Sequence, residues 1–572
     1  MTVGRRGAVA VATVALALLV PAAASAHAYL VKTVPAASVI LSSPPRSVQL
    51  TYDEAVEPRF AIVSVTDVHA HQETTGSVTR SPSNPDTLVV PLKRVGAGWY
   101  LVYWRAISVD GHPVQGAFTF AVGPNAGPAP QFTIPHIAGT ATSTPLVVAK
   151  WLAFLTTMAA IGLFVLRIAI ARPLVHRVSG TSLRPLTVAF GVVAVLGLVA
   201  IPAYVEEAVA IDSLRSFWDV SAVVPLWRLT AFGRGYVDLE LCFALFAAAA
   251  ALAIWVDRPE RGRRSVAALL ALGGALIAAG AVLVLPGVVG HAGQTSPRGV
   301  AVLLDWLHLV SGSLWIGGLI GLLVVWGSLP VAKRVAGLVV CVPRFSNVAF
   351  VSVLVLLATG VGASVLHLPV LDALWLTTYG KVILLKAGLL LAAMLLASVN
   401  LLRTKPGLSS VEVSEASARL LRGLVSGEVL LVSGAILAAA VLSSVAPPPP
   451  AFAEEGSALA QVGPGKVAST VVRGGYRLQV LVEPNQAAAP DTFGLRLTRG
   501  GKPVQGADVT LTFAMLDMQM PTQEYQLAET APGVYTRKAP ALVMVGHWAL
   551  NFTITPKGGL PFSALVVDRA GS

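Results

Sequence analysis

The chain has 572 residues, of which 55% are hydrophobic and only 12% are charged. So apolar a composition excludes a set of soluble domains and is typical of a polytopic membrane protein with soluble parts appended. The formal net charge is +12, but membrane topology accounts for many of the basic residues, so no nucleic-acid partner is expected.

Residues 1–26 have the pattern of a secretory signal peptide. Arg5 and Arg6 precede a long apolar run, and the small residues 24–26 form the pattern that signal peptidase recognises. Cleavage there makes His27 the first residue of the mature chain. Its α-amine, the first amide nitrogen and its imidazole can then chelate a metal, and nitrogen ligands suit Cu(II). The alternative is that His27 is only tolerated after the cut.

Residues 27–122 read as a small all-β domain. Runs such as "SVQLTYDEAV" and "GWYLVYWRAISV" are short, β-branched or aromatic, and separated by turn residues, which predicts a β-sandwich. In "SVDGHPVQGAFTF", Asp110 and His112 are two residues apart and face one side of an extended chain. Together with an N-terminal His27 they would form a nitrogen-rich Cu(II) site. The alternative is a turn capped by Asp110, with His112 exposed.

Three segments of this domain, "HAYLVKTVPA", "SVQLTYDEAV" and "SVDGHPVQGAFTF", resemble the CopC family of copper-resistance proteins. The resemblance implies that His27, Asp110 and His112 are the copper ligands. Some CopC proteins also carry a methionine-rich Cu(I) site. This domain has no methionine after the predicted cut, so we expect that second site to be absent.

Residues 123–145 read as a linker, and eight apolar stretches of bilayer-spanning length follow. Because the mature N-terminus is secreted, the first span runs inward. The loops then expected inside carry most of the basic residues, among them Arg258, Arg261, Arg263 and Arg264. An even number of spans returns the chain to the outside. The protein is therefore predicted to be multi-pass in the cell membrane, with both soluble domains extracytoplasmic. The spans are expected at about 146–168, 186–204, 239–256, 266–289, 300–326, 347–366, 381–402 and 420–444.

The fifth span, within "LLDWLHLVSGSLWIGGL", carries two ionisable residues on one helix face. Asp305 and His308 are three apart, and ionisable groups inside a span usually face a cavity, a partner or a pathway. His291 and His367 are expected at a similar depth, at the outer ends of the fourth and sixth spans. Together these four residues predict a metal entry site. The alternative is that His291 and His367 are ordinary interfacial residues.

The W-L-H sequence followed by W-x-G-G in this span resembles the CopD family of copper-resistance membrane proteins, over about residues 145–445. The resemblance implies copper passage across the membrane. The first span, "KWLAFLTTMAAIGLF", weakly echoes the fifth and has Ala153 in the place of His308. Lys386 and Glu428 are further buried ionisable residues, which would either line a path or serve structure alone.

Residues 446–465 begin with "APPPP" and read as a stiff linker, and residues 466–572 alternate like a second β-sandwich. Met518, Met520, Met544 and His547 gather here and predict a Cu(I) site, since thioethers favour Cu(I). The alternative is a methionine-filled core, and Met515, which is out of phase with Met518, is expected in that core. The domain resembles the YtkA-like family.

The predicted fold is thus a multi-domain membrane protein: an N-terminal all-β sandwich (27–122), an eight-helix transmembrane bundle (146–445) and a C-terminal all-β sandwich (466–572). The predicted function is copper binding outside and copper transport into the cytoplasm, without enzymatic activity. The partners are copper ion, the lipid bilayer, and an extracytoplasmic copper chaperone or reductant, because Cu(II) capture followed by Cu(I) passage requires reduction. The alternatives are a copper sink without transport and a haem or copper redox membrane protein.

Overall fold

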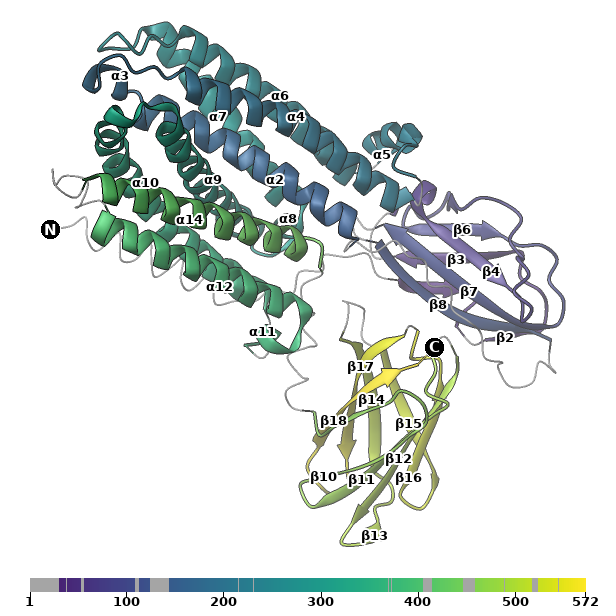
Figure 1. Cartoon of the computed structure of the whole chain (residues 1–572). Coiled ribbons are helices and arrows are strands. Elements are labelled where there is room, and N and C mark those ends of the chain that lie inside the picture. The colour runs from purple at the N-terminus through teal and green to yellow at the C-terminus, as the bar shows by residue number, and fades with distance from the viewer. Residues whose placement is uncertain are drawn as a thin grey trace, which may run out of the picture.

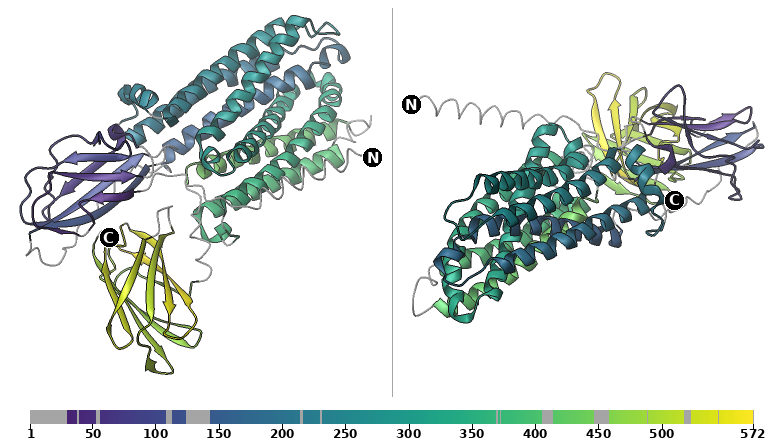
Figure 2. Two further views of the ribbon diagram at one scale, coloured as in Figure 1. Left: turned by 180° about the vertical axis from the view of Figure 1, so that it is seen from behind. Right: turned by 90° about the horizontal axis from the view of Figure 1, so that it is seen from above.

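The protein consists of a helical bundle and two β-domains that lie at the same end of it (Figures 1 and 2). Long helices form the bundle, strands β1 to β8 form the first β-domain, and β9 to β18 form the second. The computed structural model describes residues 30–37, 39–52, 56–107, 113–123, 143–213, 216–229, 231–368, 370–371, 373–404, 414–445, 458–487, 489–516, 523–543 and 545–571.

The N-terminal β-domain is a sandwich, as predicted. One four-stranded sheet has the order β1-β3-β6-β5 and the other has the order β2-β8-β7-β4. Strand β3 shows the cause, because Val48, Leu50 and Tyr52 point into the core and alternate with less buried residues. The strands are β1 (Leu30–Val34), β2 (Ile40–Leu41), β3 (Ser47–Tyr52), β4 (Ile62–Thr66), β5 (Thr79–Arg80), β6 (Thr87–Pro91), β7 (Gly98–Ile107) and β8 (Pro113–Val122).

Eight helices of the described chain are long and apolar enough to cross a membrane, in agreement with the eight predicted spans. The sixth begins at Val331 rather than near 347, because its first turns bury Leu338, Cys341 and Phe345 and so continue the helix. The long helices are α2 (Thr144–Val165), α4 (Arg184–Ser213), α6 (Ala231–Val256), α7 (Val266–Val289), α9 (Arg298–Ser328), α10 (Val331–His367), α12 (Thr378–Val399) and α14 (Ser414–Leu442). The short ones are α3 (Leu174–Arg177), α5 (Val223–Leu229), α8 (His291–Gln294) and α11 (Ala373–Leu376).

Helices α2 and α9 form the centre of the bundle. The most apolar stretch of the span that begins with α2 is 72% buried within the protein, and that of α9 is 61% buried. The corresponding stretch of α12 is only 6% buried. Helix α2 packs on α4, α9 and α14, while α9 packs on α10, α2 and α7. The other spans therefore surround this central pair and present their apolar outer faces to lipid.

Glycine makes the contact between α2 and α9 close. A Cβ atom on Gly162 would lie 2.7 Å from the Gly317 Cα, and one on Gly317 would lie 2.6 Å from the Gly162 carbonyl carbon. A Cβ on Gly318 would lie 2.7 Å from the Phe345 ring of α10. Neither glycine of the W-x-G-G motif has room for a side chain, because each one meets a different neighbouring helix.

The N-terminal domain contacts the bundle through its second sheet. Arg105 of β7 is only 1% exposed, and its Nη2 donates a hydrogen bond of 3.2 Å to the Ile211 carbonyl of α4. Phe60 and Ile107 belong to the same apolar cluster as the helices. The last residue of β7 is therefore packed at the end of the bundle.

The C-terminal β-domain curves into a nearly closed barrel around one apolar core. Its ten strands form one sheet in the order β10-β11-β12-β16-β15-β14-β17-β18-β9, with β13 paired to β12. The strands are β9 (Ala460–Val462), β10 (Val467–Arg473), β11 (Tyr476–Glu483), β12 (Asp491–Arg499), β13 (Lys502–Pro503), β14 (Asp508–Met515), β15 (Gln523–Ala531), β16 (Val534–Ala539), β17 (Gly546–Thr555) and β18 (Phe562–Ala570). The Val543 carbonyl accepts a 3.3 Å hydrogen bond from the Ala117 amide of β8, so the two β-domains touch.

The glycine contact predicts a sharp difference between two glycines of the same helix. Gly317→Ala is expected to destabilise the full-length protein by about 1–3 kcal/mol, because its methyl group overpacks the contact between α2 and α9. Gly327→Ala has no atom within 4 Å to clash with and is expected to leave stability unchanged or raise it. Thermal unfolding of both variants in detergent measures the difference, and equal melting temperatures would contradict the packing described.

Candidate metal centre

Two of the predicted metal sites fall largely outside the described residues. His27, Asp110 and His112 of the first site lie outside them, as do Met518, Met520 and Met544 of the C-terminal site. The strands next to these segments are described, and their ends show where in each domain the segments are attached.

The described strand ends next to these two segments, Leu30 of β1 and Ile107 of β7, lie at the same end of the N-terminal sandwich. Leu30, the first residue of β1, pairs with Tyr52 of β3, whose ring contacts Trp104 of β7 edge-on at 5.6 Å. Strand β7 ends three residues later, where Ile107 pairs with Pro113 of β8. Residues 108–112, which include Asp110 and His112, follow Ile107 in the sequence, and Ile107 itself packs against the bundle.

His308 has a partner on each ring nitrogen. The Thr359 hydroxyl donates to the Val355 carbonyl at 2.6 Å, so its oxygen is the acceptor for His308 Nδ1–H at 2.9 Å. This assigns the proton to Nδ1 and leaves the lone pair on Nε2. Lys386 Nζ of α12 lies 3.3 Å from that Nε2 and donates to it. The nitrogen that a metal would bind is therefore covered by an ammonium group.

Asp305 completes this cluster one turn nearer the start of α9. It lies against α7 at Gly287, where a Cβ atom would come within 2.8 Å of the Asp305 Oδ2. The adjacent Trp306 donates from its indole nitrogen to the Gly280 carbonyl of α7 at 3.1 Å, which orients this face of α9. Asp305 and Lys386 carry opposite charges and interact electrostatically. The sequence indicated Asp305 and His308, whereas Thr359 was missed, although a hydroxyl in an apolar span is the signal that points to it.

His367 forms a separate layer nearer the helix ends. Its Nδ1 donates to the Ala363 carbonyl at 2.7 Å, and its Nε2 accepts from the Thr295 hydroxyl at 3.2 Å. His367 is eight residues beyond Thr359, or about 12 Å along α10. His291 begins α8, just before Thr295, and its side chain is outside the described set. Among the described residues no three His, Cys, Asp or Glu side chains gather as a metal site. Asp305 and His308 lie beside Lys386 on one face of α9.

A second buried polar cluster lies deeper in the bundle, around Glu428 of α14. Its side chain is only 2% exposed and accepts a hydrogen bond from Asn400 Nδ2, while the Trp315 indole of α9 lies beside it. Asn400 begins a π-helical turn (Asn400–Thr404) after α12, a geometry that is frequent at functional sites. The clusters around Lys386 and Glu428 thus lie at two depths along α9 and α12.

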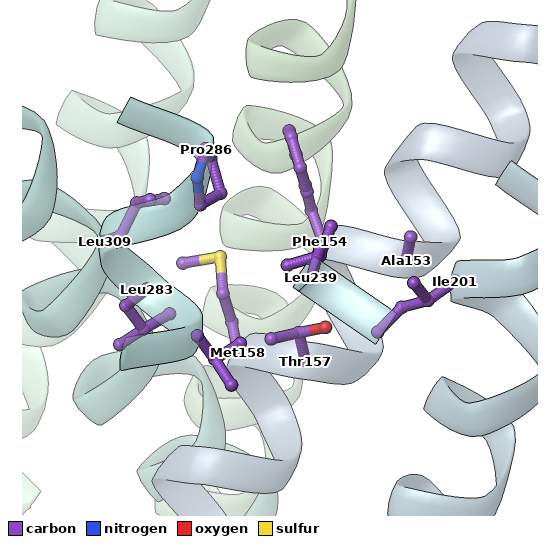
Figure 3. A pocket seen from close by; sticks show the side chains of 10 residues that line it. Ala153, Phe154, Thr157, Met158, Ile201, Leu239, Leu283, Pro286 and Leu309 are labelled. Atoms are coloured by element: carbon purple, nitrogen blue, oxygen red, sulfur yellow. The ribbon is translucent and has the colours of Figure 1, made fainter. Parts of the chain in front are cut away.

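A small cavity lies between α2, α4, α6 and α7, next to Leu309 of α9 (Figure 3). Its volume is about 20 Å³, which accommodates one water-sized particle. The Met158 thioether of α2 points into it, near Leu309, which follows His308, and near Pro286 of α7 (Figure 3). The rest of the lining is apolar apart from Thr157.

In the C-terminal domain, His547 is exposed at the start of β17, beside the end of β14. Its carbonyl accepts a 2.8 Å hydrogen bond from the Leu516 amide, so His547 lies at the edge of the barrel from which the segment with Met518 and Met520 leaves. Met515 is buried in the core, as predicted.

The same edge of the barrel buries two carboxyl groups. Asp491 and Asp568 are fully buried. Asp491 Oδ1 accepts from the amides of Asn485 and Gln486 at 2.7 and 3.1 Å, and Asp568 Oδ1 accepts from Asn485 Nδ2 at 2.9 Å. Burial outweighs these bonds, so it raises the pKa of Asp491 to about 7 and that of Asp568 to about 6.

Three families match separate parts of the chain. The CopC domain family matches residues 30–123, copper resistance protein D matches 339–442, and the YtkA-like family matches 471–553. The chain belongs to the CopC/CopD copper-resistance and copper-transport proteins. The CopD match covers the helical bundle from within α10 to the end of α14. The matched CopD residues include Thr359, Lys386, Asn400 and Glu428, while α9 lies outside that match.

One relative is similar to this chain over nearly the full length of both proteins. The copper transport protein CutJ of Bacillus subtilis is 25% identical over 547 residues, which cover 93% of this chain and 94% of CutJ. Copper resistance protein C of Pseudomonas syringae pv. tomato is 33% identical over 114 residues, 19% of this chain and 90% of the relative. Among solved structures, PcoC, a methionine-rich copper resistance protein from Escherichia coli, is 30% identical and covers 17% of this chain and 99% of its own, with a TM-score of 0.16.

The buried acids predict that the C-terminal domain loses stability as pH rises. The folded domain binds a proton at Asp491 more tightly than the unfolded chain does, so its stabilisation is complete below about pH 4 and is lost as pH rises through about 7. We expect a loss on the order of 3 kcal/mol across this range. Urea unfolding of residues 458–572 at several pH values measures it.

Asp491→Asn is expected to flatten this pH dependence, because the amide keeps an acceptor oxygen and carries no charge. Glu483→Gln is the matched control, since Glu483 is half exposed and pairs with Lys466 at 2.7 Å. If Asp491→Asn retained the wild-type pH profile, the titrating group would lie elsewhere.

Proposed function

We propose that this protein binds Cu(II) at its N-terminal domain outside the cell membrane and moves copper inward along α9. His27, Asp110 and His112 hold the metal in the outer domain, and Asp305 and His308 form the first station inside the bundle. The C-terminal domain exchanges Cu(I) through Met518, Met520, Met544 and His547. Copper is the cargo, and an extracytoplasmic reductant or copper chaperone supplies it in the form that passes.

The observation that carries this proposal is the packing of Ile107. This residue ends β7 and belongs to the apolar cluster of the bundle, so the connection with Asp110 and His112 starts at the end of the helices. Arg105, two residues earlier, bonds to the end of α4. A copper ion released from this connection is thus released beside the bundle.

The chain's course supports this sidedness. Both β-domains lie at one end of the bundle (Figure 2), as eight crossings require. The secretory signal pattern and the basic loops at the opposite end support an extracytoplasmic position for that end. His291 and His367 then lie at the outer ends of their helices, above Asp305 and His308.

The stations along α9 support passage better than storage. His308 supplies one lone pair and Asp305 a carboxylate, and Met158 and then Glu428 lie deeper beside the same helix. Weak sites in series let an ion enter and leave, whereas a closed site of several ligands would retain it. The sequence has no Walker motif and no D-K-T-G loop, so the copper gradient between the two sides sets the direction.

Removal of the His308 imidazole is expected to abolish copper entry. Cells that lack the gene are complemented with wild type, His308→Ala or His176→Ala at low external copper, and cytoplasmic copper is measured by mass spectrometry of fractionated cells. Wild type should raise cytoplasmic copper, and His308→Ala should return it to the empty-vector level. His176 is exposed on α3 at the opposite end of the bundle, so His176→Ala should behave as wild type.

Improved survival in high copper without a rise in cytoplasmic copper would contradict import and identify a sink. A fall in cytoplasmic copper on expression would identify export.

The N-terminal site predicts that the mature N-terminus is itself a ligand. Residues 27–122, prepared with His27 first, should bind one Cu(II) with a nitrogen-rich electron paramagnetic resonance spectrum. His112→Ala, or one extra residue before His27, should change that spectrum and weaken binding by roughly tenfold or more, because each removes a nitrogen donor. His71→Ala is the control, since His71 is exposed and held by Asp67 at 3.1 Å. An unchanged spectrum in the extended domain would exclude the amine as a ligand.

A further inference from the structure

The connection between α6 and α7 lies at the end of the bundle away from the β-domains (Figure 1). It forms a pocket lined by arginines. The pocket has a volume of about 280 Å³. Its polar lining consists of four arginines, Arg258, Arg261, Arg263 and Arg264, together with Ser265, which caps α7. Four guanidinium groups around one cavity form a positive site for which copper transport has no use, since the cargo is a cation.

The only buried carboxylate beside this pocket in the described residues is already shared. Asp257 lies 3.6 Å from Arg167, 3.4 Å from Arg172 and 3.5 Å from Arg264. Three positive charges surround Asp257, and the exposed Glu260 of the same connection adds one more negative charge nearby. An excess of positive charge therefore remains beneath the pocket. Arg261 and Arg263 are exposed and form no ion pair within the described part of the chain.

The backbone that presents these arginines is held in place. Arg172 Nη2 donates to the carbonyls of Arg258 and Arg261 at 3.3 and 2.8 Å. The connection is therefore attached to the chain just after α2, and Arg264 adds a hydrogen bond to the Ile168 carbonyl. A backbone that is already held in place reduces the entropy lost when the arginines bind an anion.

The surroundings of the pocket are those of a bilayer boundary. Trp255, which lines it, is 70% exposed, and tryptophan is enriched at the level of lipid headgroups. Exposed apolar side chains continue from it along both helices, with Leu252 on α6 and Val266 and Leu270 on α7. An acyl chain can lie on this apolar surface while its phosphate lies among the arginines.

We propose that this pocket binds the phosphate group of an anionic phospholipid. Guanidinium pairs with phosphate oxygens through two parallel hydrogen bonds, and basic pockets between transmembrane helices recognise anionic headgroups in this way. The bound lipid neutralises the excess charge around Asp257 and joins the ends of α2, α6 and α7.

The charge of this connection would also be explained by topology alone, since basic loops stay inside. Substitution of arginine by lysine separates the two explanations. Lysine keeps the positive charge but lacks the planar guanidinium group that donates two parallel hydrogen bonds to a phosphate. The variants are Arg261→Gln with Arg263→Gln, and Arg261→Lys with Arg263→Lys. The matched control is Arg419→Gln with Arg422→Gln, two exposed arginines at the same end of the bundle, on α14.

The full-length protein in neutral detergent is titrated with phosphatidylglycerol or with phosphatidylcholine of the same acyl chains, and bound lipid is counted by native mass spectrometry. Wild type and the α14 control should bind the first phosphatidylglycerol roughly tenfold more tightly than phosphatidylcholine, as expected for two charge-assisted contacts. Both pocket variants should lose most of this preference.

Two results would overturn the site: no preference in wild type, or an undiminished preference in the glutamine variant. An undiminished preference in the lysine variant would leave only a diffuse charge effect and would also overturn it. A third titration uses inorganic phosphate alone. Phosphate binding that is lost in the glutamine variant, without any preference between the two lipids, would overturn the lipid as the source of the phosphate group.

Discussion

The contact between Gly162 of α2 and Gly317 of α9 is the constraint on which the bundle depends. A Cβ atom at either position would overlap the backbone of the other helix, so the two central helices are as close as their backbones allow. Close contact compensates for the lack of a hydrophobic driving force in lipid. It also fixes the rotation of α9, because Gly318 then meets Phe345 of α10 and the face with Asp305 and His308 turns toward α7, α10 and α12.

The same contact joins two halves of four spans each, and the helices around α2 and α9 are arranged alike. When "KWLAFLTTMAAIGLF" is aligned with "DWLHLVSGSLWIGGL", Gly162 falls on Gly317 and Trp151 on Trp306. Both indoles donate to a backbone carbonyl of a neighbouring helix, Trp151 to Ser433 and Trp306 to Gly280. The packing of α2 on α4 and α14 parallels that of α9 on α10 and α7. Only the second half has an imidazole at the aligned position, since Ala153 stands where α9 has His308.

Hydropathy and spacing along one chain predicted the eight helices and the shared face of Asp305 and His308. They could not predict Thr359 or Lys386 as partners of His308, because these residues lie on other helices and meet it only through the packing of α10 and α12 on the centre. The sequence predicted that His367 and His308 lie at a similar depth. In the structure, His367 is the last residue of α10 and has its own partners there. His308 lies about three turns inside α9, so the two residues differ in depth. The closure of the C-terminal sheet depends on which strands become neighbours, and alternation within single strands does not encode that.

The position of Lys386 determines how strongly His308 can bind a metal ion. A cation that binds Nε2 must displace the ammonium group that already donates to it, and the two positive charges repel each other in a medium of low dielectric. Asp305 reduces this repulsion, because its carboxylate attracts both cations. On the proposed path, copper would therefore bind here at a cost and leave readily when the Lys386 group returns to Nε2. A storage protein gains from a closed set of ligands without such a competitor, whereas a conduit needs a site that empties. The paired lysine and histidine are thus a physical reason to regard the bundle as a path for copper.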